Sequence, residues 1–241
     1  MDVKKEYLNV LKGKIEHAYD TQLDKIGKIA NMFGEVMDNG GVVQLFGVRH
    51  GIEFVNELNY RAGGIAPFHK LSMTELMLLK KVTKDDVYKT GAVYQKPEIA
   101  DELLGLYDLD GRDMYVLVSE KGCEPLVLEI ARKAKEKGQK IVAVVNQKYY
   151  DHCGGTLLDY ADEWLDMQSE CPDLAVTVGE YKVGQTSTTV TNIMAQMLTA
   201  ELYRYFIEKH GEAPILLSAN VKGADVHNDA LTEPYGRRVR P

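Results

Sequence analysis

Three short segments place polar and charged side chains where a predicted helix begins. They read FGVRHG at 46–51, VSEKGCEP at 118–125 and GQTSTTVTN at 184–192. Free main-chain amides and the positive end of the helix dipole favour an anion at such positions. The Arg49 and Lys121 side chains and a run of hydroxyls would strengthen that preference; the hydroxyls belong to Thr186, Ser187, Thr188 and Thr189. The three junctions therefore predict a site for an anionic small molecule.

The hydroxyls of the third junction also allow a structural interpretation. Ser187 or Thr188 could simply cap the helix that begins there. Neither nucleotide-binding pattern is present, because the chain contains no GxGxxG and no GxxxxGK[ST]. The junctions thus favour a small anion over a nucleotide.

Alternating strands and helices must position these junctions. Apolar runs predict strands over 42–46, 114–118, 141–145 and 174–178, and a last short strand in PILLSA at 214–219. Periodicity and Pro97 predict helices over 52–60, 71–81, 97–104, 125–137 and 187–209. This alternation indicates an α/β fold with a parallel sheet covered on both faces. Ligands of such sheets bind beyond the carboxyl ends of the strands, where the junctions fall.

The first 39 residues are predicted to form two helices that pack on this sheet. Thr21 followed by Asp24 resembles a capping box, so one helix is expected to begin near Thr21. The apolar stripe from Leu23 to Met37 is longer than one sheet face requires, which favours a homodimer or larger homo-oligomer. No repeat, low-complexity tract or Pro/Ser-rich linker divides the chain, so a single domain over 1–241 is predicted.

Composition excludes several classes of function. The 241 residues are 45% hydrophobic and carry a net charge of −7, without a dense basic run before the tail GRRVRP, so no nucleic-acid partner is expected. No apolar run approaches the length of a membrane span, and the N-terminus is too polar for a signal peptide. Three cysteines without CxxC spacing predict reduced thiols and a cytoplasmic protein. His152 beside Cys153 lacks a third ligand at useful spacing, so neither a metal nor another cofactor is expected.

Four blocks of the chain resemble the sugar isomerase (SIS) domain. They are FGVRHG…ELNYRAGG, VSEKGCEPLVLEIARKAKEKGQKIVAVVN, TSTTVTN and LSANVKGADVHN, and the likeness runs from Asp20 to Asn228. More narrowly, they are similar to a bacterial SIS group related to phosphoheptose isomerase. The resemblance implies a three-layer α-β-α sandwich with a five-stranded parallel sheet, assembled as dimers or tetramers. It also implies a phosphosugar ligand and interconversion of aldose and ketose forms.

Two loops depart from the pattern of that group. The first usually reads Phe-Gly-Cys-Gly-His-Ser, whereas here His50 is kept and Arg49 replaces a glycine. The second usually reads Ser-Asn-Ser-Gly and binds phosphate through its hydroxyls, and only Ser119 and Gly122 of it remain. Glu120 and Glu124 add negative charge to this loop. One interpretation is that Arg49 and Lys121 replace the lost hydroxyl donors; the other is that the site no longer binds phosphate.

Isomerisation through an enediol needs a base beside two adjacent carbons. The resemblance assigns that role to Glu57, with His50 as a second candidate; Glu53, one turn earlier, is interpreted as a solvated charge. Phosphoheptose isomerases place a histidine on the long C-terminal helix, but 187–209 contains none, and Gln196 or Glu201 would occupy the corresponding turns. The favoured hypothesis is therefore an isomerase of a phosphorylated sugar or amino-sugar derivative. The alternative is a non-catalytic SIS protein that binds a sugar metabolite, as a sensor or as a degenerate member of the family.

Overall fold

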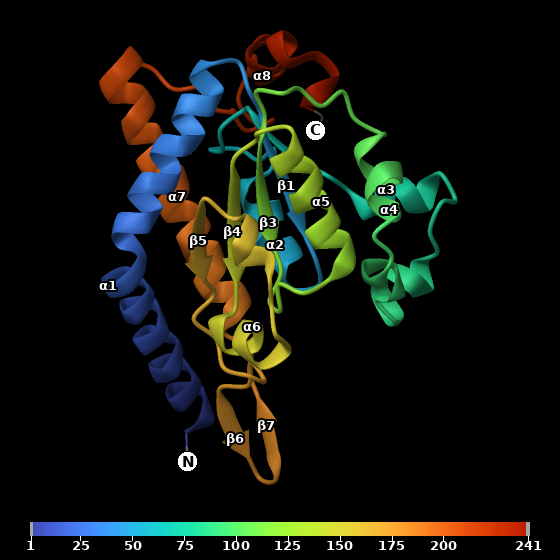
Figure 1. Cartoon of the computed structure of the whole chain (residues 1–241). Helices are drawn as coiled ribbons and strands as arrows, with labels where there is room; N and C mark the ends of the chain where they lie inside the picture. The colour runs from blue at the N-terminus through green and yellow to red at the C-terminus, as the bar shows by residue number, and fades with distance from the viewer. Residues whose placement is uncertain (1, 240–241) are drawn as a thin grey trace.

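The protein, a computed structural model described over residues 2–239, is built on a five-stranded parallel sheet (Figure 1). Met1, Arg240 and Pro241, which the single-domain prediction also covers, lie outside the described residues. The strands are β1 (Val43–Gly47), β2 (Phe68–Lys70), β3 (Met114–Val118), β4 (Ile141–Val145) and β5 (Glu163–Asp166), in the spatial order β2-β1-β3-β4-β5. Helices cover both faces of this sheet, which confirms the predicted three-layer α-β-α sandwich.

The three central strands are continuous apolar runs because both of their faces are buried. Every residue of β1, β3 and β4 is buried, and β1 pairs with β3 in register from Val43 opposite Met114 to Gly47 opposite Val118. Val43 and Leu45 belong to the hydrophobic core on one face of the sheet, whereas Phe46 belongs to the core on the other. This is the pattern that a covered parallel sheet produces.

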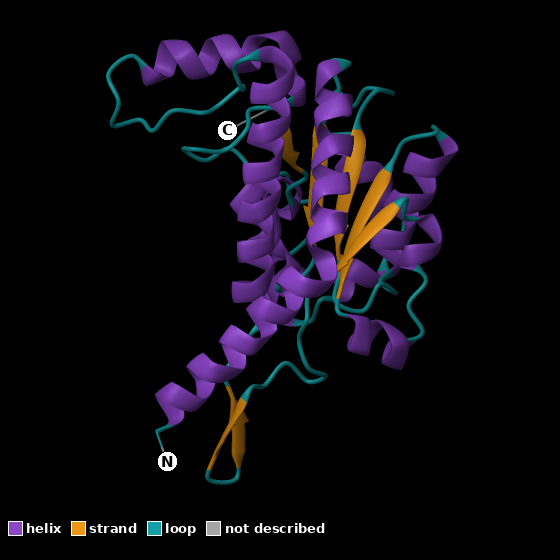
Figure 2. Ribbon diagram, turned by 90° about the vertical axis from the view of Figure 1, so that its left-hand side faces the viewer, coloured by secondary structure: helices purple, strands orange, loops and turns teal. Residues whose placement is uncertain are grey.

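Two groups of helices form the outer layers (Figures 1 and 2). One face is covered by α1 (Val3–Asp38), α2 (Gly51–Leu58) and α7 (Ser187–His210). The other is covered by α3 (Met73–Leu78), α4 (Ile99–Leu104) and α5 (Pro125–Glu136), with the short turns η1 (Asp85–Lys89), η2 (Ala92–Gln95) and η3 (Leu157–Tyr160). The remaining helical segments are α6 (Gln147–Cys153), α8 (Ala224–Thr232) and η4 (Glu233–Arg238).

The predicted helix boundary near Thr21 is wrong, because α1 is one helix from Val3 to Asp38. Thr21 turns its hydroxyl back onto the carbonyl of His17 at 2.7 Å instead of capping a new helix. Gln22 and Ile26, on either side of Asp24, are both buried. Continuous packing across the expected boundary therefore outweighs the local capping signal.

Much of the α1 stripe that favoured a dimer is covered by the protein's own α7 and sheet. Ile26, Ile29 and Phe33 are completely buried in the core. Gly34 permits the close approach of the two helices, because a Cβ at this position would lie 2.3 Å from the Tyr205 ring. The apolar side chains of α1 that stay exposed are instead Leu8, Tyr19 and Leu23.

The strand predicted over 174–178 does not join the main sheet. Within it, β6 (Val176–Val178) pairs antiparallel with β7 (Tyr181–Val183) in a hairpin that projects below the body in Figure 1. The two edge strands of the sheet, β2 and β5, were not predicted; β2 has only three residues, and only Leu165 among the four residues of β5 is fully buried. Similarly, PILLSA forms a single bridge, between Ile215 and Ile65, and not a strand.

Candidate functional site

The fold brings the three predicted junctions together at the carboxyl edge of the sheet. The first follows β1, the second follows β3, and the third begins α7. The first and third are in direct contact, because Gln185 Nε2 donates to His50 Nε2 at 3.1 Å. Glu120 of the second junction lies close enough to His50 and Arg49 to interact electrostatically with both. The three predicted junctions therefore lie near one another at this edge of the sheet.

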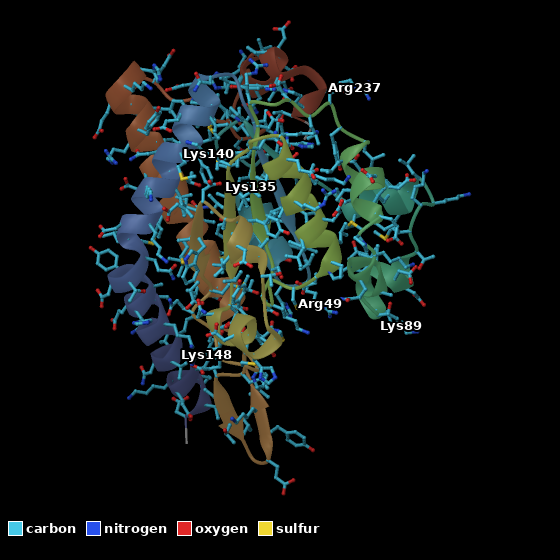
Figure 3. All side chains as sticks on the ribbon, in the orientation of Figure 1. Arg49, Lys89, Lys135, Lys140, Lys148 and Arg237 are labelled. Atoms are coloured by element: carbon cyan, nitrogen blue, oxygen red, sulfur yellow. The ribbon has the colours of Figure 1, made fainter. Side chains whose placement is uncertain are left out.

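Arg49 and His50 are neighbours in the chain but point to different sides of this edge. Arg49 has the left-handed φ of +53°, which turns its exposed side chain toward Gly91. The contact is close, since a Cβ on Gly91 would lie 2.6 Å from Arg49 Nη2. Figure 3 shows Arg49 beyond the carboxyl ends of the strands, below α5. His50 instead faces Gln185, a partner that nothing in the local sequence indicates.

The second junction closes on itself through Ser119. Ser119 is fully buried; its Oγ accepts from the Gly122 amide at 2.8 Å and donates to the carboxylate of Glu124. Gly122 has a φ of +60°, and a Cβ there would meet the Tyr150 ring at 2.6 Å, so this turn requires glycine. Lys121 is half-buried and forms no ion pair with any residue that the structure describes. The Ser119 hydroxyl, which the resemblance assigns to phosphate binding, is thus already hydrogen-bonded within the loop.

The third junction is capped by a residue that the sequence analysis missed. The carboxylate of Asp173 accepts from the amides of Thr186 and Ser187 at 3.0 and 2.9 Å and from Thr186 Oγ1 at 2.8 Å. Neither Ser187 nor Thr188 caps α7, and Thr186 is the N-cap residue by position alone. No signal in the sequence identifies Asp173, because the hairpin separates it from the helix that it caps.

Glu120 is an acidic residue of this edge that lies near both acidic and basic groups. Glu120 is half-buried, and burial raises the pKa of its carboxyl group; the neighbouring carboxylates of Asp173 and Glu124 raise it further, while His50 and Arg49 oppose the shift. Among residues 2–239, no side chain forms a hydrogen bond or ion pair with the Glu120 carboxylate. An acceptor with this little compensation favours a ligand that donates to it.

Glu57 of α2 lines one end of a groove that runs along α7. The groove has a volume of about 550 Å³ and is lined by Glu57, Thr188, Thr189, Asn192, Ile193, Gln196, Met197 and Ala200. Glu57 Oε1 accepts from Gln196 Nε2 at 2.5 Å, and the carboxylate also pairs with Arg61. Of the two candidates for the histidine position, Gln196 therefore contacts Glu57, whereas Glu201 pairs with Arg204 at 2.8 Å.

The groove also contains a polar atom without a hydrogen-bond partner among residues 2–239. This atom is the buried Asn192 Oδ1, and the sequence analysis did not single it out. It lies on α7 four residues after Thr188 and four before Gln196, so the three polar side chains follow one face of the helix. This face presents hydroxyl and amide groups of the kind that bind sugar hydroxyls.

Metal-type clusters and membrane spans are not found in residues 2–239. No three side chains among His, Cys, Asp and Glu gather there in a geometry that could hold a metal ion. No helix in the same range combines the length and the apolar character needed to cross a bilayer. Cys123, Cys153 and Cys171 are free thiols.

The SIS domain family model matches residues 6–146, more than half of the chain, and the protein therefore belongs to the SIS domain family. A similar relative is UPF0309 protein TTE0306 of Caldanaerobacter subterraneus subsp. tengcongensis, which is 30% identical over 97% of this chain and 98% of its own.

Solved structures agree at the level of the fold. The phosphoheptose isomerase from Francisella tularensis matches with a TM-score of 0.55 and 14% identity, covering 83% of this chain and 96% of that one. The Vibrio vulnificus NanR protein complexed with ManNAc-6P matches with a TM-score of 0.52 and 14% identity, covering 97% of this chain and 70% of that one. At these identities the likeness shows the SIS fold and leaves the ligand to the chemistry of the site.

Proposed function

We propose that this protein binds a sugar or amino-sugar derivative at the carboxyl edge of its sheet and interconverts the aldose and ketose forms of that ligand. The observation that carries the proposal is the Glu57 carboxylate, held by Gln196 and Arg61 on the wall of an open groove. A positioned carboxylate is a suitable base for the proton beside a sugar carbonyl. The SIS structures of a phosphoheptose isomerase and of a complex with ManNAc-6P support a sugar ligand.

In this proposal Glu57 removes the proton from C2 of an open-chain aldose that carries a hydroxyl at C2, and returns it to C1 of the enediol. Gln196 donates to Glu57 and fixes the direction of its carboxylate, but an amide does not ionise near neutral pH and so cannot act as a general acid or base. His50 is the candidate for the proton transfer at the sugar oxygen, because it is the N-cap residue of α2 and lies two helical turns before Glu57 on the same side. Thr188 and Asn192 would bind the sugar hydroxyls along the groove.

The remaining residues of the predicted site keep a proposed part in binding. Arg49 and Lys121 are the cationic residues of this edge. The hydrogen bond between Gly122 and Ser119 fixes the loop that carries Lys121. Thr186 and Ser187 hold the start of α7 at the mouth of the groove. We also propose that the protein acts as a homo-oligomer in the cytoplasm; the exposed apolar side chains of α1 and the three free thiols support these two points.

The experiment is exchange of the C2 proton in D₂O, followed by proton NMR. The panel contains aldoses and 2-amino aldoses, each as the free sugar and as the terminal phosphate. Glu57→Gln should lower the exchange rate by roughly 10²–10⁴-fold while the melting temperature stays near that of the wild type. The matched control is Glu53→Gln, an exposed carboxylate on the same helix, which should exchange at the wild-type rate. Equal rates in wild type and Glu57→Gln would remove Glu57 from the mechanism.

A second candidate function is binding without catalysis. It is favoured by Gln196, which occupies the place beside Glu57 where the resemblance expects a titrating histidine. Under this alternative, a sugar of the panel raises the melting temperature of the wild type but no proton exchanges on any member of the panel.

A further inference from the structure

A second cavity lies at the carboxyl edge of the sheet, where β1 and β2 end. Its volume is about 60 Å³, and Gly47 of β1 and Lys70 of β2 are among the residues that line it. Neither Glu57 nor any other residue of the groove along α7 lines this cavity. A cavity of this size has room for roughly four or five groups of the size of water, so it can hold only a small ligand.

Lys70 supplies a positive charge that the protein itself leaves unpaired. Its Nζ donates to Asn56 Oδ1 at 3.0 Å, and within residues 2–239 it forms no ion pair. Asn56 belongs to α2, which also contributes Ile52 and Val55 to the wall, so this hydrogen bond holds the ammonium group beside the cavity. Among the described residues that line the cavity, none is acidic. An ammonium group with spare donors and no carboxylate beside it favours an anion.

Three hydroxyl groups line the same cavity, those of Ser72, Thr74 and Tyr88. Ser72 Oγ accepts from the Thr74 amide at 3.2 Å, which leaves the Ser72 hydroxyl free to donate. Thr74 Oγ1 and Tyr88 OH lie 3.5 Å apart, a separation too long for a strong hydrogen bond. The hydroxyls can therefore donate to the second oxygen of an anion that Lys70 holds.

The backbone that carries Tyr88 gives an independent sign of function. Val87 and Tyr88 belong to η1, which is a π-helical turn in which the Thr90 amide donates to the Asp85 carbonyl at 2.9 Å. Turns of this kind are rare in proteins and occur frequently at functional sites. This wall of the cavity thus has a conformation that ordinary helix packing does not require.

The remaining wall of the cavity is aliphatic. It is formed by Ile52, Val55, Leu71, Met73 and Val87. A phosphate or sulfate ion has oxygen atoms on all sides, and those that face aliphatic side chains would lose the hydrogen bonds they make in water. A short carboxylate carries its charge at one end only, so its hydrocarbon end can face this wall. The combination of one cation with an aliphatic wall therefore favours a carboxylate over an inorganic anion.

We propose that this cavity binds a short-chain monocarboxylate of about two to four carbons. The carboxylate pairs with Lys70 and accepts from the hydroxyls, and the hydrocarbon end contacts the aliphatic wall. The inference goes beyond the proposed function and does not depend on it, because the cavity shares no residue with the groove that contains Glu57.

The first test compares melting temperatures in sodium chloride, propionate, hexanoate and phosphate at equal ionic strength and pH. Propionate should raise the melting temperature of the wild type by several degrees over chloride, with saturation, because it binds the folded state. Phosphate and hexanoate should not, since the first lacks an apolar end and the second is too long. Lys70→Met keeps most of the side-chain length without the charge and should abolish the rise. Lys84→Met, which replaces an exposed lysine beside η1 that does not line the cavity, is the matched control and should respond as the wild type does.

The second test follows reductive methylation of the wild-type lysines by mass spectrometry, so it needs no variant to fold. Propionate at ten times its Kd should slow the methylation of Lys70 by about tenfold, because the bound carboxylate covers the ammonium group. The rate at Lys84 should be the same in propionate and in chloride.

The inference is overturned if propionate fails to stabilise the wild type or fails to protect Lys70. An equal rise in phosphate or hexanoate also overturns it, because the cavity then does not select the ligand. A rise that Lys70→Met keeps and Arg49→Ala loses would place the anion at the first junction instead. Glu57→Gln should respond to propionate as the wild type does even if no sugar exchanges a proton, so failure of the proposed function and failure of this inference give different results.

Discussion

Gln22 and Asp166 exchange two hydrogen bonds between a helix and the edge of the sheet. Gln22 Nε2 donates to the Asp166 carbonyl at 2.7 Å, and the Asp166 amide donates to Gln22 Oε1 at 2.8 Å. The side-chain amide thus takes the place of a neighbouring strand on the open side of β5. Edge strands expose unpaired main-chain groups that can pair with other chains, and here α1 covers one such position.

Gln22→Leu should destabilise the protein by about 2–4 kcal/mol, because two main-chain groups of Asp166 lose their partners in a site that is 2% exposed. The free energy of unfolding from urea titration measures the change. Asn31→Leu, which replaces an exposed amide on the same helix, is the control and should change the stability little. Equal stabilities of the two variants would show that the paired amide contributes nothing.

Gln196→Leu should lower the rate of C2-proton exchange by about tenfold or more if the proposed function holds. The variant removes a charge-assisted hydrogen bond to Glu57, worth on the order of 1.5–3 kcal/mol, and leaves the carboxylate paired with Arg61 alone. The comparison is Glu201→Gln, one turn further along α7, whose partner is Arg204. A loss of the same size in Glu201→Gln would contradict the assignment of Gln196 to the place beside Glu57.

Light scattering at micromolar concentration should give at least twice the 27.0 kDa mass of one chain. The exposed Leu8, Tyr19 and Leu23 lie on one side of α1, which makes this side the expected interface. Tyr19→Glu combined with Leu23→Glu should then give a monomer. Val226→Glu on α8, where the side chain is 77% exposed, is the control and should leave the mass unchanged. A wild-type monomer would refute the predicted assembly.

Acid should remove a contribution of Glu129 to stability. Hydrogen bonds from Arg132 to both carboxylate oxygens, at 2.7 and 2.8 Å, lower the pKa of Glu129 from 4.5 to about 2. A depressed pKa in the folded state means that this contribution is complete above about pH 4.5 and is lost as the pH falls toward 2. Between these values the wild type should therefore lose more stability than Glu129→Gln, measured by urea titration at each pH. Glu98→Gln, an exposed carboxylate outside this pair, should follow the wild type.

The parts of the fold that the sequence predicts are those with a local physical cause. Unbroken apolar runs place β3 and β4 at the predicted residues, and Pro125 marks the start of α5 as expected. The edge strands β2 and β5 were not predicted, because a strand of three residues and a partly buried strand with polar ends both resemble loops in sequence. Residues 174–178 lie outside the main sheet, since Asp173 just before them caps α7 and β6 pairs with β7. Both contacts are tertiary, so the local sequence does not indicate them.

The candidate site likewise has features that the local sequence predicts and features that only tertiary contacts produce. The junctions could be located from strand ends and helix starts, since these are local features. The contact of Asp173 with Ser187 and that of Gln185 with His50 join positions far apart in the chain, so no pattern indicates them. The left-handed backbone at Arg49 also escapes prediction, because only the tertiary structure favours that conformation in a non-glycine residue.

The bonds between Asp173 and Thr186 also define the hairpin as an appendage. Residues 174–185 leave the body and return to it close to where they left, because the Asp173 carboxylate lies 3.0 Å from the Thr186 amide. A segment closed at its base in this way can lengthen or shorten during evolution at small entropic cost, about 0.6 kcal/mol for each doubling of its length. The length of the hairpin can therefore change while the bonds at the start of α7 stay the same. The chain could gain or lose a projecting surface in this way without a change in the helix end.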